Sequence, residues 1–204
     1  DVYKRQLDAL PRADRRVEFI RESLVELDDS LRALSPQGRG GLIVWHAVAS
    51  DAIPALANAL DAQAVFANHD DEPQALDRDR LVRTRLAAAG KAFHTFKDHT
   101  LLERSEVLTQ TGNPYSVFTP YKNAWLKKID VFQLKSYPVE RHAHHLAARP
   151  EAHCQPVPTL QDLGFEPTAL SQLRLPTGAR GAQQLFDDFL GRIERYEDCL
   201  LYTS

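Results

Sequence analysis

The chain has 204 residues and a formal net charge of −3, with 43% hydrophobic and 26% charged residues. That composition is typical of a globular domain, and the acidic balance excludes a protein that is basic overall, as many nucleic-acid-binding modules are. No apolar run approaches the length of a membrane span, so we expect no membrane partner. Cys154 is the one cysteine outside the terminal residues, which excludes an internal disulfide and favours a reducing, cytoplasmic location.

The two ends of the chain differ in character from the rest. Residues 1–6, DVYKRQ, and residues 199–204, CLLYTS, can be encoded by the two strands of one DNA element. That element resembles a transposon end used to build sequencing libraries. We therefore expect both hexapeptides to be sequencing or cloning scars, and residues 7–198 to be an internal piece of a longer gene.

The first predicted elements are a helix, a strand and a second helix. Apolar residues recur at three- and four-residue spacing over residues 13–34, which predicts an amphipathic helix. The continuous apolar run LIVWHA, residues 42–47, follows glycines and predicts a buried parallel strand. Residues 51–60 predict a short helix with Asp51 as N-cap and Pro54 in its first turn.

The alternation continues further along the chain. Residues 64–68, AVFAN, predict a second buried strand, residues 73–90 a helix ending at Gly90, and residues 91–96 a third strand. Alternating helices and strands predict a parallel sheet with helices on both faces, in a Rossmann-like or flavodoxin-like α/β fold. The first strand of that sheet, with its helix, is expected to precede residue 7.

The stretch GNPYSVFTPYKNAWLKK, residues 112–128, predicts a short amphipathic helix. Thr119 suits the N-cap position and Pro120 the first helical position. Trp125 would dock this helix on the sheet, while its lysines would face solvent.

After residue 129 the character of the chain changes. Prolines are frequent throughout residues 130–180, which predicts a long, irregular connector. Four histidines and Cys154 within it are residue types that bind zinc, but their spacing matches no strong zinc pattern, so no metal site is predicted. Residues 181–198 predict an amphipathic helix that begins a second, all-α domain.

Candidate binding residues follow the predicted strands, because open parallel sheets bind ligands at the carboxyl ends of their strands. Residues 68–74, NHDDEPQ, form one such end, although their acidic residues are better interpreted as caps of the next helix. Residues 94–103 contain two histidines, an aspartate and a glutamate, which we interpret as surface and strand-end residues. The chain has no G-x-G-x-x-G, P-loop or G-x-S-x-G motif.

The stretch EVLTQTGNPYSVFTPYKNAWLKK, residues 106–128, closely resembles the end of the N-terminal α/β domain in the DNA photolyase and cryptochrome family. That family shows Leu-x-Thr, Gly-x-x-Tyr and then Val-Phe-Thr-Pro-Phe/Tyr-Lys-x-Ala-Trp. Other segments fall in register, so the resemblance spans residues 7–198. It implies an antenna-chromophore domain at 7–129, an interdomain connector at 130–180, and the start of an FAD-binding helical domain at 181–198.

The resemblance implies an activity that composition does not reveal. Photolyases of this family hold reduced FAD in the helical domain. After excitation by light, an electron passes to a cyclobutane pyrimidine dimer flipped out of the DNA duplex, and the dimer splits. The chain is therefore predicted to be a fragment of a DNA photolyase, a carbon–carbon lyase, and to be inactive alone. Its partner would be UV-damaged DNA, bound through the missing domain, and the full-length protein is expected to be a monomer.

The resemblance to the family assigns a role to two site residues of this chain, Tyr196 and Gln74. Tyr196 aligns with a family tyrosine that contacts FAD, although its helical phase also suits packing. Gln74 and Ala75 align with an Asn-Glu pair that holds a folate antenna. Because Ala75 offers no carboxylate, a folate is in doubt, and a deazaflavin, a flavin or an empty antenna site are all open.

Two other functions are open. A cryptochrome photoreceptor would differ in the part of the protein that lies outside this chain. A stand-alone nucleotide-binding α/β module would share only the topology, and the helix predicted at residues 181–198 argues against it.

Overall fold

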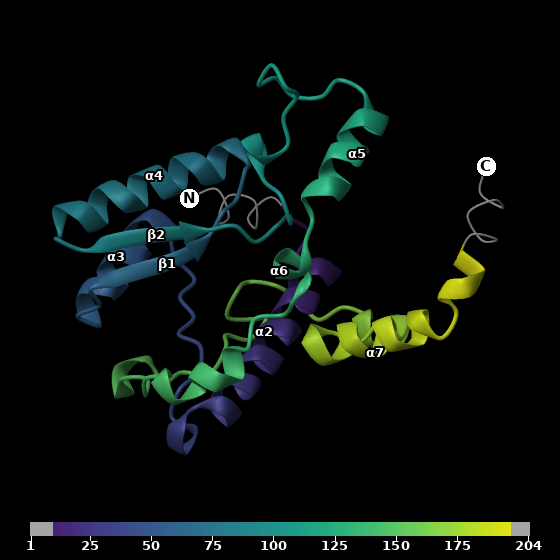
Figure 1. Ribbon diagram of the computed structural model, residues 1–204. Coiled ribbons are helices and arrows are strands. Elements are labelled where there is room, and N and C mark those ends of the chain that lie inside the picture. Colours follow the sequence, from purple (N-terminus) through teal and green to yellow (C-terminus); the bar gives the residue numbers. More distant parts are fainter. Residues whose placement is uncertain (1–9, 197–204) are drawn as a thin grey trace. The chain divides into compact units, whose positions relative to one another are not determined.

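The computed structural model describes residues 10–196, so both predicted scars lie outside the described residues. The chain forms two compact units (Figure 1). The described part of the first, which we call the α/β unit, is residues 47–138. The described part of the second, the helical unit, is residues 10–46 and 139–196. The units do not follow the predicted domain boundaries, because residues 10–46 group with the C-terminal part of the chain and not with the sheet.

The α/β unit contains two parallel strands, which confirms the predicted α/β class. β1 (Ala64–Asn68) pairs with β2 (Ala92–Phe96), with Ala64 opposite Ala92 and Asn68 opposite Phe96. The helices of the unit are α3 (Ala49–Ala59), α4 (Pro73–Ala88), α5 (Phe118–Lys128) and α6 (Val131–Leu134), with a 3₁₀ turn at Arg104–Glu106.

Within the α/β unit, α3 and α4 pack on one face of the sheet. Ala57 of α3 and Val82 and Leu86 of α4 form the core, against which Val65 and Phe93 pack from the strands. Side chains alternate along a strand, so Phe66, His94 and Phe96 point to the opposite face. The rings of this second face stack on one another and are exposed. The helix that was expected to help cover the sheet lies in the helical unit.

The predicted strand at residues 42–47 is wrong, because this segment is extended but unpaired with any described strand. Side chains form hydrogen bonds with backbone groups that would otherwise bond to a neighbouring strand. The backbone N–H of Leu42 donates to Asp28 Oδ1 at 2.7 Å, and Arg149 Nη1 donates to the Leu42 carbonyl, also at 2.7 Å. An apolar run predicts burial, but a strand also needs a partner.

Two predicted N-caps are also wrong. α3 begins at Ala49 after Val48, so Asp51 lies in its first turn, where its carboxylate accepts a hydrogen bond from Arg85. α5 begins at Phe118 after Val117, which places Thr119 inside the helix. Neither observed N-cap residue has a side chain that can accept a hydrogen bond, so the rule that places Asp or Thr at the cap missed both boundaries.

The predicted docking of α5 on the sheet is not observed. No residue of α5 is buried, and Trp125 is only partly covered. The helix thus forms as predicted, but Phe118 is 73% exposed and Trp125 is only partly covered.

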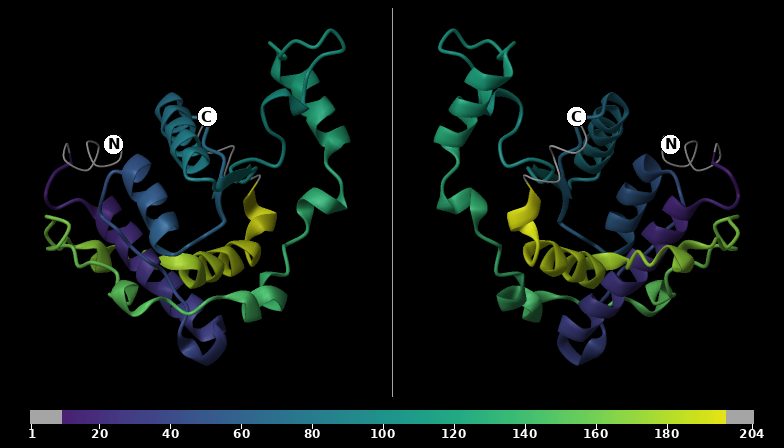
Figure 2. Two further views of the ribbon diagram at one scale, coloured as in Figure 1. Left: turned by 90° about the vertical axis from the view of Figure 1, so that its left-hand side faces the viewer. Right: turned by 90° about the vertical axis from the view of Figure 1, so that its right-hand side faces the viewer.

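The helical unit is built on two helices. α2 (Arg15–Leu34) packs against α7 (Gly178–Leu190), which crosses it in both views of Figure 2. The predicted irregular connector is confirmed, and within the helical unit it contains only short 3₁₀ turns, at Val139–His145, Glu151–His153 and Leu170–Leu173. Two further 3₁₀ turns lie at Pro36–Gly38 and Ile193–Arg195. α7 begins three residues before the predicted start at residue 181.

A buried ion pair ties three segments of the helical unit together. Asp28 on α2 and Arg149 on the connector have side chains that are 7% and 8% exposed. Arg149 Nη1 lies 3.4 Å from Asp28 Oδ1, and both side chains also hold Leu42. Gly41, at φ +131°, passes so close that an added Cβ would lie 2.5 Å from Asp28 Oδ1. The site therefore requires glycine both for backbone conformation and for space.

Asp14 caps α2 and should make the helical unit sensitive to acid. Hydrogen bonds from the Arg16 side chain and backbone lower the pKa of Asp14 to about 2. Because the unfolded chain binds this proton near pH 4, the stabilisation is present above that pH and is lost as pH falls toward 2. We expect Asp14→Asn, which retains a capping oxygen, to lose less stability than the parent between pH 4 and pH 2 in urea unfolding. Equal losses in the two proteins would contradict this.

Candidate functional site

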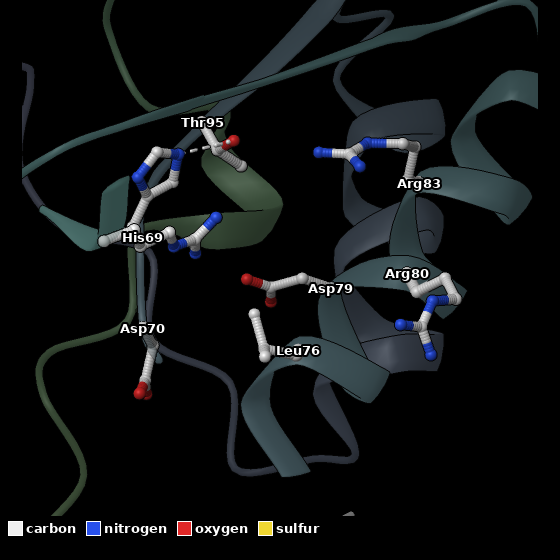
Figure 3. Close-up of a pocket in the computed structure, with 8 residues that line it drawn as sticks. His69, Asp70, Leu76, Asp79, Arg80, Arg83 and Thr95 are labelled. Atoms are coloured by element: carbon white, nitrogen blue, oxygen red, sulfur yellow. Dashed lines mark hydrogen bonds between the residues drawn. The ribbon is translucent and has the colours of Figure 1, made fainter. Parts of the chain in front are cut away.

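A pocket of about 190 Å³ lies at the carboxyl ends of β1 and β2, within the α/β unit (Figure 3). This is the position where open parallel sheets bind ligands. Its walls come from the two strand ends, the loop after β2, and one side of α4. The lining residues are His69, Asp70, Leu76, Asp79, Arg80, Arg83, Thr95 and Arg104.

His69 is held in place by two hydrogen bonds and by its backbone. It directly follows β1, and its N–H donates to the Phe96 carbonyl at 2.7 Å, which extends the sheet by one bond. Its Nδ1 lies 2.7 Å from the largely buried Glu103 Oε2, and its Nε2 lies 3.1 Å from Thr95 Oγ1. In the tautomer that carries its proton on Nδ1, the ring donates to the Glu103 carboxylate and accepts from the Thr95 hydroxyl. The imidazole is thereby fixed in orientation at the edge of the pocket.

The loop that supplies Glu103 is tightly organised. Glu103 caps the 3₁₀ turn at Arg104–Glu106, and the Glu106 carboxylate accepts a hydrogen bond from the Glu103 N–H. Arg104 has φ +43°, a left-handed conformation that costs a non-glycine residue on the order of 1–3 kcal/mol. Its guanidinium forms a 2.9 Å ion pair with Asp71. The strained residue thus ties the loop after β2 to the loop after β1, beside the pocket.

The wall contributed by α4 is charged. Figure 3 shows Asp79 and Arg83 on α4 facing His69 and Thr95 across the pocket. Arg78 forms a 2.8 Å ion pair with Asp79, so this carboxylate is partly neutralised. The Arg83 guanidinium lies 5.5 Å from the centre of the Phe93 ring, which holds it over the core. The guanidinium groups can donate to an anionic or carbonyl group, and Asp79 can accept from hydroxyl groups.

The pocket is small and lined mainly by polar and charged groups. Its lining contains no cysteine, serine or lysine, while the Thr95 hydroxyl, the His69 ring and the Glu103 carboxylate are linked by hydrogen bonds in that order. A volume of about 190 Å³ is below the roughly 300 Å³ at which typical small-molecule sites begin. The pocket can therefore enclose a polar end of a larger molecule, but not the whole of it.

The structure places the two predicted site residues apart from this pocket. Gln74 lies exposed in the first turn of α4, outside the lining, and its neighbour Ala75 is buried in the α/β unit. Tyr196 lies in the helical unit, where its half-exposed ring contacts Phe189 at 6.0 Å between ring centres. The contact agrees with the packing alternative. The roles of Gln74 and Tyr196 in binding a chromophore or FAD stay predictions.

Sequence reasoning missed most of the pocket. The end of β1, which includes His69, was singled out as a possible ligand site, but Arg83 was not, and the stretch that holds Thr95 and Glu103 was interpreted as surface and strand-end residues. Thr95 could have been found by applying the strand-end rule to both strands, which were correctly predicted. The contact of Glu103 with His69 could not have been predicted in this way, because the two residues are 34 positions apart in sequence and no periodic pattern links them.

Between residues 10 and 196, no group of three or more His, Cys, Asp or Glu side chains is arranged to hold a metal ion. No helix in the same range is long and apolar enough to span a membrane.

The fold and the pocket together describe an α/β unit with a cavity at the ends of its two strands. A family model described as DNA photolyase matches residues 3–150. The chain therefore belongs to the DNA photolyase family.

Individual relatives agree with this membership. The chain is 38% identical over 186 residues to a deoxyribodipyrimidine photo-lyase of Halobacterium salinarum, a match that covers 90% of the chain and 37% of the relative. It is 35% identical over 152 residues to an uncharacterized 31.6 kDa protein of a Synechococcus species, covering 73% of the chain and 51% of that protein. Cryptochrome-1 of Arabidopsis thaliana is 30% identical over 106 residues, covering 50% of the chain and 15% of the relative. The chain thus spans about a third to a half of the length of the first two.

Proposed function

We propose that this chain is part of a light-driven, FAD-dependent photolyase that splits cyclobutane pyrimidine dimers in DNA. The observation that carries the proposal is the 38% identity with a deoxyribodipyrimidine photo-lyase over 90% of the chain. UV-damaged DNA would be the substrate, bound outside this chain by a protein that acts as a cytoplasmic monomer. When bound in its reduced form, FAD supplies the electron that opens the dimer after the damaged bases have left the duplex.

The α/β unit would serve as the antenna domain. Its pocket supports this role because guanidinium and carboxylate groups converge where an open sheet binds ligands. Arg83 and Arg104 would hold a carbonyl or anionic group of the chromophore, and Asp79 would accept from its hydroxyl groups. If the chromophore is a flavin or deazaflavin, its tricyclic ring system would lie outside the pocket, because the pocket volume is too small to enclose it.

A folate antenna is disfavoured by the surroundings of residue 75. Ala75 provides no carboxylate, and its position is buried, so residue 75 cannot pair with Gln74 on a ligand. Gln74 alone would offer one amide to a ligand. We propose a deazaflavin or a flavin in preference to a folate.

The helical unit would carry the start of the flavin site. Tyr196 is the residue proposed to touch FAD, and half of its surface is accessible despite the Phe189 contact. A single aromatic side chain does not make a flavin site. We therefore propose that FAD is held almost wholly by residues outside this chain.

A cryptochrome is the second candidate, favoured by the match to a plant cryptochrome. That match is weaker in identity and covers half of the chain. The complete reading frame of the gene distinguishes the two candidates. A helical domain with a Thr-Ser-rich phosphate-binding loop, spaced tryptophans and a dimer-binding pocket supports the photolyase. An altered pocket followed by a long tail supports the photoreceptor, and a frame that ends soon after the helical segment contradicts both.

The 204-residue chain alone should not repair DNA. With FAD held almost wholly by residues outside this chain, as proposed above, no electron donor would be held against the dimer. We expect no light-dependent loss of dimers from irradiated oligothymidylate incubated with this chain and free reduced FAD. A full-length photolyase of the same family serves as the positive control. Light-dependent splitting by the chain would show that the described residues already contain the catalytic site.

A further inference from the structure

Three side chains at the pocket of the α/β unit form one hydrogen-bonded row. Thr95 Oγ1 lies 3.1 Å from His69 Nε2, and His69 Nδ1 lies 2.7 Å from Glu103 Oε2. A hydroxyl, an imidazole and a carboxylate in this order are the three groups of a nucleophile–histidine–carboxylate triad, here with threonine as the nucleophile. Such a triad is recognised by its geometry and not by a sequence motif.

Each nitrogen of the His69 ring lies on the side that triad chemistry requires. Nε2 meets the hydroxyl, where it can take the proton of Thr95, and Nδ1 meets the carboxylate, which holds the ring in that orientation. The Glu103 side chain is 9% exposed, and the 3₁₀ turn that follows it fixes its position. A carboxylate held in this way also stabilises the imidazolium that forms when His69 accepts a proton.

Arg83 supplies a positive charge across the pocket from the hydroxyl. Figure 3 shows this residue on α4 facing Thr95. Among the described residues Arg83 forms no ion pair, since the neighbouring Asp79 pairs with Arg78. A guanidinium group in this position can stabilise the negative charge that develops on a carbonyl oxygen when the carbonyl carbon is attacked.

We propose that this pocket hydrolyses esters of small carboxylic acids. Its volume of about 190 Å³ admits a short acyl group and leaves the alcohol part of the ester outside. Thr95 Oγ1 attacks the carbonyl carbon while His69 Nε2 takes its proton, and the bond to the alcohol oxygen then breaks. The alcohol leaves with the proton from His69. Water, deprotonated by His69, then attacks the acyl–Thr95 ester, which releases the carboxylic acid and returns the proton to Thr95.

This activity goes beyond the proposed light-driven repair, because it needs neither light nor flavin. A chromophore held in the pocket would cover Thr95 and block the reaction, so hydrolysis belongs to the protein without an antenna chromophore. A purely structural role for the row, in which the three side chains only tie the loop after β2 to the end of β1, predicts no covalent intermediate. Acylation of Thr95 therefore separates the two roles.

The test uses the 204-residue chain and p-nitrophenyl acetate. We expect a burst of nitrophenolate equivalent to one per chain, because the acyl–threonine forms faster than water cleaves it. Peptide mass spectrometry of the quenched reaction should locate the acetyl group on Thr95. Thr95→Val, which keeps the shape of the side chain, should abolish the burst and the modification, and Thr95→Ser should retain both. His69→Gln should slow acylation by about 10²–10⁴-fold, the usual contribution of a general base.

His94→Gln is the matched control, since His94 precedes Thr95 on β2 but is exposed on the opposite face of the sheet. Any exposed imidazole cleaves activated esters slowly, so equal losses in His94→Gln and His69→Gln would overturn the proposal. So would a missing burst, acetyl groups on lysines only, or hydrolysis unchanged in Thr95→Val. Circular dichroism confirms that each variant is folded. Failure of this assay leaves the proposed dimer repair untouched, and a failure of repair leaves this result standing.

Discussion

Asp28→Ala is expected to destabilise the helical unit by about 3–5 kcal/mol, because it leaves Arg149 buried without its carboxylate partner. The Leu42 N–H loses its acceptor in the same substitution. The Nε of Arg149 is buried and already lacks a hydrogen-bond partner in the described structure. Loss of the Asp28 carboxylate would therefore add a second unsatisfied group to the same guanidinium. The loss would be the largest for any single charged residue that we identify in this unit.

The measurement uses a Trp125→Phe background, in which Trp45 is the one tryptophan and lies in the helical unit. Urea unfolding followed by its fluorescence then reports this unit. Asp29→Ala is the matched control, since Asp29 is the next residue on α2 and is exposed. The control should change stability by less than about 0.5 kcal/mol. Similar losses in the two variants would mean that the buried pair contributes no special stability.

Leu86→Ala should have a comparable effect on the α/β unit. Leu86 is 0% exposed at the centre of the core between α3, α4 and the sheet. Truncation leaves a cavity that close-packed neighbours fill only in part, at a cost of about 2–5 kcal/mol. Leu81→Ala on the same helix is the control, because Leu81 is 43% exposed and its loss creates no enclosed cavity.

Hydrogen exchange of the β2 amides is the appropriate measurement for Leu86→Ala, because it reports opening of the sheet directly. Exchange should accelerate strongly in Leu86→Ala and little in Leu81→Ala. Unchanged protection of β2 in Leu86→Ala would show that the cluster around this side chain is not the stabilising core of the unit.

Local patterns predicted the elements of the α/β unit well. Hydrophobic periodicity and helix-stop signals located β1, α4 and β2 to within two residues, and Gly90 has the positive φ expected after a helix. The same signals failed for residues 42–47. Whether an apolar run becomes a strand depends on a neighbour, and here Asp28 and Arg149 bind the backbone of Leu42 instead. That competition involves residues far apart in sequence.

Burial was harder to predict than helix formation. The amphipathic pattern of α5 correctly predicted a helix, but a pattern does not say which surface the apolar side receives. α5 buries no residue, so the expected burial of this helix against the sheet is not observed. In the same way, the order of helices and strands predicted a sheet covered on both faces, and α3 and α4 of the α/β unit pack on one of them.

The pocket shows why sites are only partly predictable. The carboxyl end of a parallel strand is a place that sequence can locate once the strand is known, and His69 lies there. The geometry of the site depends on Glu103 and Arg104, which lie at a strained 3₁₀ turn in the loop after β2. Neither the residue types nor their spacing predicts such a turn. Family resemblance pointed instead to Gln74, which lies outside the pocket.

Light-dependent repair by the protein of the complete reading frame tests the central proposal most directly. The purified protein, reduced and with its flavin bound, is mixed with dimer-containing oligothymidylate and illuminated, with a dark sample as control. The proposal predicts recovery of thymine absorbance in the light and none in the dark. A flavin-containing protein that binds the damaged strand but restores no thymines in the light would contradict it and favour a photoreceptor.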